Sequence, residues 1–92
     1  MTDLLNARLH TTNQAVESRV GDETVLLHLQ RGDYFGLDAV GTRIWELLKQ
    51  GDTPAAICDR LAQEYDMPRA TIEGDLRKFL SELKAQDLVL EG

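Results

Sequence analysis

The sequence predicts a small α+β domain in which a three-stranded antiparallel sheet is followed by three helices. Two stretches, 15–20 and 23–30, are typical of strands, and Gly21-Asp22 between them is suited to a tight turn. A third strand is expected at 34–37. The rest of the chain carries apolar residues at helical spacing between capping residues. With 92 residues, the chain is long enough for one small domain and too short for two.

The predicted strands form a meander with two open edges. The first strand alternates along its length, which is typical of a strand with one buried face. The turn Arg31-Gly32-Asp33 leads into the third strand, Tyr34 to Leu37. In the second strand, the residues expected to face the core are Val25, Leu27 and Leu29, and those expected to face away are Thr24, Leu26, His28 and Gln30.

Each of the three helices has a recognisable beginning. Asp38 is a suitable N-cap for a helix over 39–50, which ends before Gly51. Thr53-Pro54 opens the second helix, and Pro68 starts the last one, which runs to about residue 86. The first two helices have apolar sets that include Val40, Ile44, Trp45, Leu47 and Leu48, and then Ile57, Cys58, Leu61 and Tyr65. A small sheet must cover its apolar face with these helices, so a winged-helix-like arrangement is expected.

The domain is expected to occupy residues 15–92. Residues 1–14 are polar and predict a flexible N-terminal segment, in which Leu9 can add a short extended piece. The final Leu88-Val89-Leu90 is expected either to pack back on the core or to pair as a strand. The connections are short and no repeat is present.

Composition argues against several classes of partner. The net charge of −6 disfavours general nucleic-acid binding, which depends on Lys and Arg neutralising phosphates. No apolar run approaches the roughly 20 residues that span a membrane, and the start of the chain lacks the pattern of a secretory signal. We therefore expect a cytoplasmic protein with no nucleic-acid and no membrane partner.

The sequence predicts no catalytic residue, no metal site and no cofactor. His10 and His28 are expected in a loop and on a strand, both exposed, and no nucleophile or carboxylate is placed beside either by local spacing. Cys58 is the single cysteine and lies on the apolar side of its helix, so we expect a small buried side chain. Asp33 and Asp38 fit a turn and a helix cap. An enzyme is therefore not predicted.

The last predicted helix has two different flanks. Its central stripe is Ile72, Leu76, Phe79 and Leu83. One flank carries Asp75, Glu82 and Gln86, and the other carries Arg69, Glu73, Arg77, Leu80 and Lys84. The second flank is net basic and includes an additional leucine. Two interpretations stay open: Leu80 widens the core stripe, or it lines a groove.

The second interpretation predicts a peptide-binding groove between this helix and the third strand. An unpaired strand edge presents free N–H and C=O groups, and an added peptide strand would satisfy them. The aromatic residues of the third strand would supply a pocket for alternate side chains. The predicted peptide-binding residues are Asp33, Tyr34, Phe35, Gly36, Leu37, Arg69, Ile72, Glu73, Leu76, Arg77, Leu80 and Lys84. The basic members of the set would meet acidic residues of the bound chain.

The order of motifs resembles the PqqD family over about Val16 to Leu90. The stretches that carry the resemblance are Leu26-Leu27-His28-Leu29, Arg31-Gly32-Asp33-Tyr34-Phe35-Gly36-Leu37-Asp38, Val40-Gly41-Thr42-Arg43-Ile44-Trp45-Glu46-Leu47-Leu48, Gly51-Asp52-Thr53-Pro54 and Phe79-Leu80-Ser81-Glu82-Leu83-Lys84-Ala85-Gln86-Asp87-Leu88-Val89. The resemblance implies a precursor-peptide recognition element, which binds the leader segment of a ribosomally made peptide beside the third strand and the last helix. It also implies a winged-helix-like fold.

Within that family the chain looks like the stand-alone leader-binding proteins of lasso-peptide pathways. Their implied partners are the leader segment, a leader-cleaving cysteine protease and a cyclase. The pyrroloquinoline quinone branch is the alternative, although it usually carries a proline-glutamate turn where this chain has Gln30-Arg31-Gly32-Asp33. A DNA-binding winged helix is a further alternative, which the acidic turn at Gly21-Asp22-Glu23 disfavours. The chain is expected to be a monomer or a domain-swapped dimer.

Overall fold

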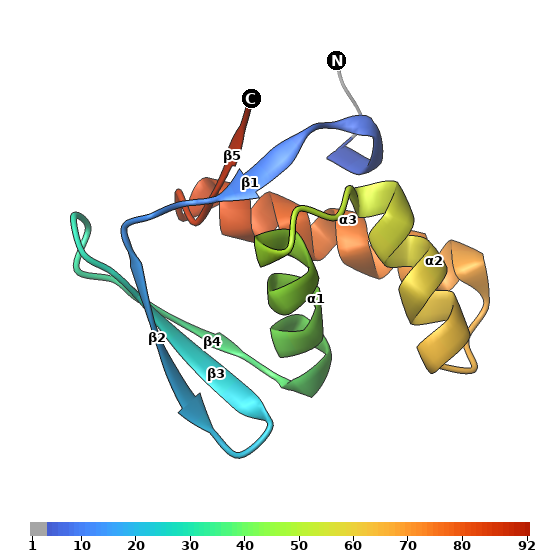
Figure 1. Cartoon of the computed structure of the whole chain (residues 1–92), viewed down its shortest axis with the longest axis horizontal. Helices are drawn as coiled ribbons and strands as arrows, with labels where there is room; N and C mark the ends of the chain where they lie inside the picture. The colour runs from blue at the N-terminus through green and yellow to red at the C-terminus, as the bar shows by residue number, and fades with distance from the viewer. Residues whose placement is uncertain (1–3) are drawn as a thin grey trace.

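The computed structural model describes residues 4–92, and Figure 1 shows the order of the elements along the chain. Five strands, one short 3₁₀ helix and three α-helices occur within this range. They are η1 (Leu4–Asn6), β1 (Leu9–Thr11), β2 (Ala15–Val20), β3 (Glu23–His28), β4 (Tyr34–Leu37), α1 (Ala39–Lys49), α2 (Pro54–Glu64), α3 (Arg69–Ala85) and β5 (Val89–Glu91). The predicted α+β class, with a three-stranded antiparallel sheet followed by three helices, is confirmed.

The three-stranded sheet is an antiparallel meander in the order β2-β3-β4. Val16 pairs with Leu27, and Leu27 pairs with Tyr34, so these three residues lie on one face. On the opposite face, the Thr24 hydroxyl accepts a hydrogen bond from the Thr42 hydroxyl of α1 at 3.1 Å. Figure 1 shows the helices on one side of this sheet, with α1 nearest to it. The other face of the sheet is exposed.

The predicted orientation of β3 was wrong. Leu26 and His28 are buried, with 0% and 4% exposure, whereas Leu29 is 57% exposed. The strand carries leucine on both faces, and a one-residue change of register exchanges the faces completely, so the alternation alone could not choose between them. His28 was expected in solvent. Its Nδ1 atom instead accepts a hydrogen bond from the Arg31 backbone N–H at 3.3 Å, which gives this ring nitrogen a partner at the β3–β4 turn.

The predicted helix beginnings agree with the caps in the structure. Asp38 accepts a hydrogen bond from the Gly41 N–H, and Thr53 accepts one from the Ala56 N–H. Pro54 occupies the first turn of α2. Each cap satisfies a backbone donor that would otherwise lack a helical partner. The helices bury most of the expected apolar set, including Trp45 and Cys58, and burial raises the pKa of the Cys58 thiol.

A second sheet joins the two ends of the described chain. β1 pairs antiparallel with β5, and His10 lies opposite Leu90. The side chains of Leu5, Ala7 and Leu9 are buried in the same core as the helices. The core therefore includes part of the segment that was expected to be flexible, and the C-terminal residues pair as a strand, one of the two outcomes expected for them. Residues 1–3 of that expected segment lie outside the described residues.

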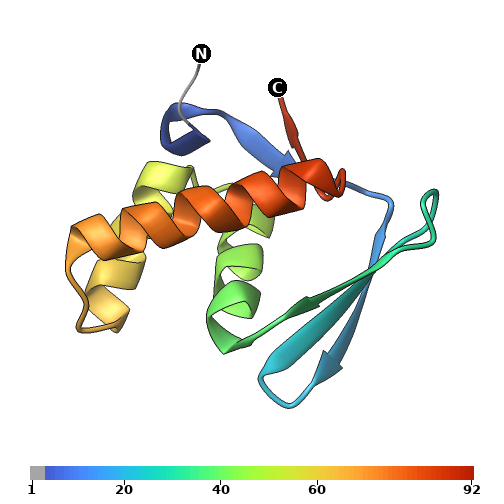
Figure 2. The same ribbon diagram turned by 180° about the vertical axis from the view of Figure 1, so that it is seen from behind.

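The longest helix, α3, connects the helical part of the domain to the β1-β5 sheet. Figure 2 shows α3 crossing both α1 and α2, with the β2-β3-β4 sheet extending away beneath it. Arg31 in the β3–β4 turn bonds the Ala85 carbonyl and the Asp87 carboxylate at the far end of α3, at 3.1 Å and 2.9 Å. These contacts hold the sheet against one end of the helix. Within residues 4–92, no helix is both long and apolar enough to cross a membrane.

Candidate functional site

The first feature of the site is the unpaired edge of β4. This strand pairs only with β3, so its other edge lies free within the described residues. The His28 N–H donates to the Asp33 carbonyl, and directly opposed pairs alternate between bonded and non-bonded along an antiparallel ladder. Phe35 and Leu37 therefore bond to β3. The backbone N–H and C=O groups of Tyr34 and Gly36 point instead toward the open edge.

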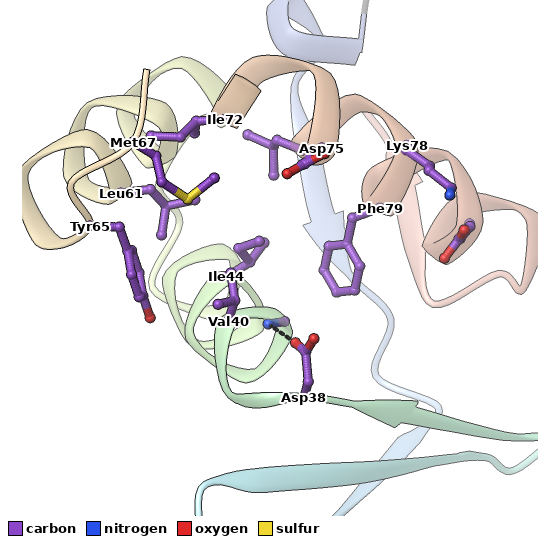
Figure 3. A pocket seen from close by; sticks show the side chains of 13 residues that line it. Asp38, Val40, Ile44, Leu61, Tyr65, Met67, Ile72, Asp75, Lys78 and Phe79 are labelled. Carbon is purple, nitrogen blue, oxygen red and sulfur yellow. Dashed lines mark hydrogen bonds between the residues drawn. The ribbon is translucent and has the colours of Figure 1, made fainter. Parts of the chain in front are cut away.

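The second feature is a pocket that begins where β4 ends. It has a volume of about 430 Å³ and lies between α3, the first turns of α1 and the end of α2 (Figure 3). Its apolar lining residues are Val40, Ile44, Leu61, Tyr65, Met67, Ile72, Leu76 and Phe79. Its other lining residues are Asp38, Gly41, Asp75, Lys78 and Glu82. The pocket thus has an apolar interior and a charged border.

Local packing fixes the shape of this pocket. A Cβ atom on Gly41 would lie 3.3 Å from the ring of Phe79, so the absence of a side chain lets that ring approach α1. On the opposite side, Figure 3 shows Tyr65 and Met67 facing the cavity from the end of α2 and the following loop. Arg43 holds this end of α2 to α1 through three hydrogen bonds to Glu64, at 3.0 Å, 3.3 Å and 2.8 Å. The pairing raises the pKa of Arg43 and lowers the pKa of Glu64.

The structure brings together only part of the predicted site. Tyr34 is 73% exposed and Gly36 is exposed on β4, whereas Phe35 is half-buried and Leu37 is buried. Ile72 and Leu76 line the pocket with only a small exposed fraction. Leu80 is fully buried, at 0% exposure, so it cannot form an open wall without a rearrangement of the core. The interpretation of Leu80 as part of a wider core stripe is the one that the structure supports.

The predicted basic flank of α3 lies away from this pocket. None of the residues Arg69, Glu73, Arg77 and Lys84 lines it. Arg69 instead bonds Asp59 of α2 and Glu73 of its own helix, and these bonds raise the pKa of Arg69. Lys84 bonds Glu91 of β5 at 2.6 Å. These charges therefore connect α3 to its neighbours on the side that faces α2 and β5.

The pocket opens on the other flank of α3, which carries Asp75, Lys78, Phe79 and Glu82. The sequence indicated no binding role for this flank. The apolar wall of the groove was expected on the opposite flank, because Leu80 lies there among basic residues. Phe79 was the overlooked signal. It belonged to the predicted central stripe but borders the acidic side of the helical wheel, so it is half-buried and reaches the pocket.

Fold and site together define a small winged-helix-like domain that presents a free strand edge next to an apolar pocket. Within residues 4–92, no group of three or more His, Cys, Asp or Glu side chains is placed to hold a metal ion. His10 and His28 lie on different sheets. The arrangement can offer backbone hydrogen bonds and apolar contact to a ligand.

The chain belongs to the PqqD family. The family model described as coenzyme PQQ synthesis protein D matches residues 23–89. The structure is similar to that of TbiB1 in complex with the TbiA(beta) leader peptide, with 49% identity, a TM-score of 0.83, and coverage of 87% of this chain and 93% of that chain. It is also similar to a lasso peptide synthetase B1 complexed with the leader peptide, with 25% identity, a TM-score of 0.82, and coverage of 91% and 99%. No curated protein matches the chain.

Proposed function

We propose that this chain binds the leader segment of a ribosomally made precursor peptide, as part of a lasso-peptide pathway. The observation that carries the proposal is the free edge of β4, where Tyr34 and Gly36 direct unpaired backbone groups outward beside an apolar pocket. The similarity to TbiB1, whose structure contains a leader peptide, supports the same conclusion at 49% identity.

The leader would add to the sheet as a further strand. Its backbone would bond the Tyr34 and Gly36 groups, each bond contributing roughly 0.5–1.5 kcal/mol. One apolar side chain of the leader would enter the pocket near Phe79, where burial of apolar surface stabilises by about 25 cal/mol per Å². The binding residues under this proposal are Tyr34 to Leu37 together with the pocket lining, rather than the basic flank of α3.

The chain would act as an adaptor without chemistry of its own. It would deliver the precursor to a leader-cleaving cysteine protease and to a cyclase, by raising the concentration of the peptide at these enzymes. The delivery step predicts that a leader-cleaving cysteine protease of the same pathway removes the leader faster when the chain is present. An unchanged rate of cleavage would contradict delivery while leaving leader binding standing.

Isothermal titration calorimetry tests the binding step. The synthetic TbiA(beta) leader peptide serves as the probe, because the similar protein TbiB1 was solved with it. We expect saturable binding with one peptide per chain, and no binding of a scrambled peptide of the same composition. Absence of binding by the TbiA(beta) leader, or equal binding by the scrambled peptide, would contradict the proposed function.

A further inference from the structure

The border of the pocket is acidic, and this inference rests on the proposed function of the pocket. Asp38, Asp75 and Glu82 contribute three carboxylates to the lining, and Lys78 contributes the single lining cation. Among residues 4–92, neither Asp75 nor Glu82 takes part in any of the ion pairs found, although both lie on the exposed flank of α3. One oxygen of Asp38 is occupied by the Gly41 N–H at 2.8 Å. The border is therefore net negative.

The charges on the opposite flank of α3 behave differently. Arg69 pairs with Asp59 and Glu73, and Lys84 pairs with Glu91. Arg77 approaches Glu73 at 3.9 Å. The charges on the flank facing α2 and β5 are thus paired within the fold, whereas Asp75 and Glu82 at the pocket form no ion pair with the described residues. A complementary ligand would supply cations at the pocket.

The position of these carboxylates suggests where the cations would lie in the ligand. A strand added along β4 passes Tyr34 and Gly36 and then reaches Asp38, the residue at which the pocket begins. An apolar ligand side chain inside the pocket would contact Phe79, and Asp75 and Glu82 lie on α3 four and three residues from Phe79. Ligand residues adjacent to that anchor would therefore pass close to the two carboxylates.

We propose that the bound leader carries lysine or arginine next to the apolar residue that enters the pocket, and that Asp75 and Glu82 select this cation. The assignment reverses the charge preference that the sequence predicted for the groove. The contribution per exposed ion pair is modest, so charge would select among leaders and speed association more than it sets affinity. The net charge of −6 would favour encounter with a cationic peptide in the same way.

A substitution array of the TbiA(beta) leader peptide tests the proposal. Each position is changed in turn to Lys and to Glu, and binding of the chain is measured for every peptide. We expect at least one position beside an essential apolar residue where Lys binds about three- to tenfold better than Glu, with the difference shrinking at high salt. The double variant Asp75→Lys/Glu82→Lys should reverse this preference.

The control is the double variant Asp22→Lys/Glu23→Lys, which changes the net charge by the same amount in the β2–β3 turn and at the first residue of β3. It should keep the preference of the unaltered chain. The inference is overturned if Lys and Glu bind equally at every position, or if the two double variants change the preference equally. If no peptide of the array binds the unaltered chain, the proposed function fails and this inference fails with it.

Discussion

The ring of Phe79 packs against the backbone of Gly41, and a Cβ atom at that glycine would lie 3.3 Å from two ring carbons and 3.2 Å from the Asp38 carboxylate. This contact joins α3 to the first turn of α1 at the border of the pocket. The position of Phe79, and with it the shape of the pocket, therefore depends on the absence of a side chain at residue 41.

Gly41→Ala should change ligand binding more than stability. Alanine improves helix propensity by about 1 kcal/mol, while the crowding of Phe79 and Asp38 opposes that gain. We expect a free energy of unfolding within about 1 kcal/mol of the unaltered chain, and weaker binding of the leader peptide because Phe79 must move. Thermal unfolding and calorimetry measure the two quantities. Unchanged leader affinity would show that the position of Phe79 does not matter for binding.

Gly36→Pro should abolish most leader binding while keeping the fold. The Gly36 N–H points away from β3, so a proline there removes no bond of the ladder but blocks the open edge. Gly36→Ala is the matched control, because nothing lies within 4 Å of its Cβ position and the N–H remains. We expect at least about tenfold weaker binding for the proline variant, and near-normal binding for the alanine variant. Equal affinities would argue against strand addition at this edge.

Phe79→Ala and Leu80→Ala should have opposite effects: Phe79→Ala should mainly reduce leader affinity, and Leu80→Ala should mainly reduce stability. Leu80 is fully buried, so its truncation should cost about 2–5 kcal/mol of the free energy of unfolding. Phe79 is half-buried and lines the pocket, so its truncation should cost less stability and more leader affinity. Chemical denaturation and calorimetry on both variants provide the comparison. If the Leu80→Ala chain had unaltered stability and reduced leader affinity, Leu80 would line the binding groove rather than the core.

Glu64→Gln should lower stability at neutral pH by no more than about 1 kcal/mol, because the Arg43–Glu64 pair is partly exposed to solvent. The pKa of Glu64 is lowered from its ordinary value of 4.5 in the folded chain, mainly by hydrogen bonding to Arg43. The pair therefore stabilises the fold fully at pH values above the ordinary pKa of Glu64. That contribution is lost as the pH falls through the lowered pKa of Glu64 in the folded chain. Melting curves of both chains should converge in acid. A constant difference between pH 7 and pH 3 would remove the ionic explanation.

The local signals in the sequence were sufficient for most of the fold. Asp38 and Thr53 cap helices where their side chains suggested, and the Gly21-Asp22 turn joins two strands as expected. The face of β3 that turns toward the core could not be predicted in the same way. Leucines occupy both faces of the strand, and only the contacts with α1 determine which face is buried. The pairing of β1 with β5 joins residues about 80 positions apart, and no local pattern specifies so distant a partner.

The candidate site uses the two elements that the sequence predicted, β4 and α3, but its pocket opens on the other flank of α3. The β4 edge follows from strand order, which the sequence specifies through short turns. The side of α3 that opens to the pocket depends on which flank faces α2 and β5. Within the fold, Arg69 pairs with Asp59 and Lys84 pairs with Glu91, so the role of the basic flank as a ligand contact stays a prediction. Helical periodicity identifies such flanks without identifying their neighbours.

Amide hydrogen exchange, measured residue by residue with and without the TbiA(beta) leader peptide, tests strand addition at β4 most directly. In the free chain the Phe35 and Leu37 amides should already exchange slowly, because they bond to β3, while Tyr34 and Gly36 exchange fast. Bound leader should slow the exchange of Tyr34 and Gly36 and leave the other two nearly unchanged. Saturated binding with fast exchange remaining at both Tyr34 and Gly36 would contradict the account.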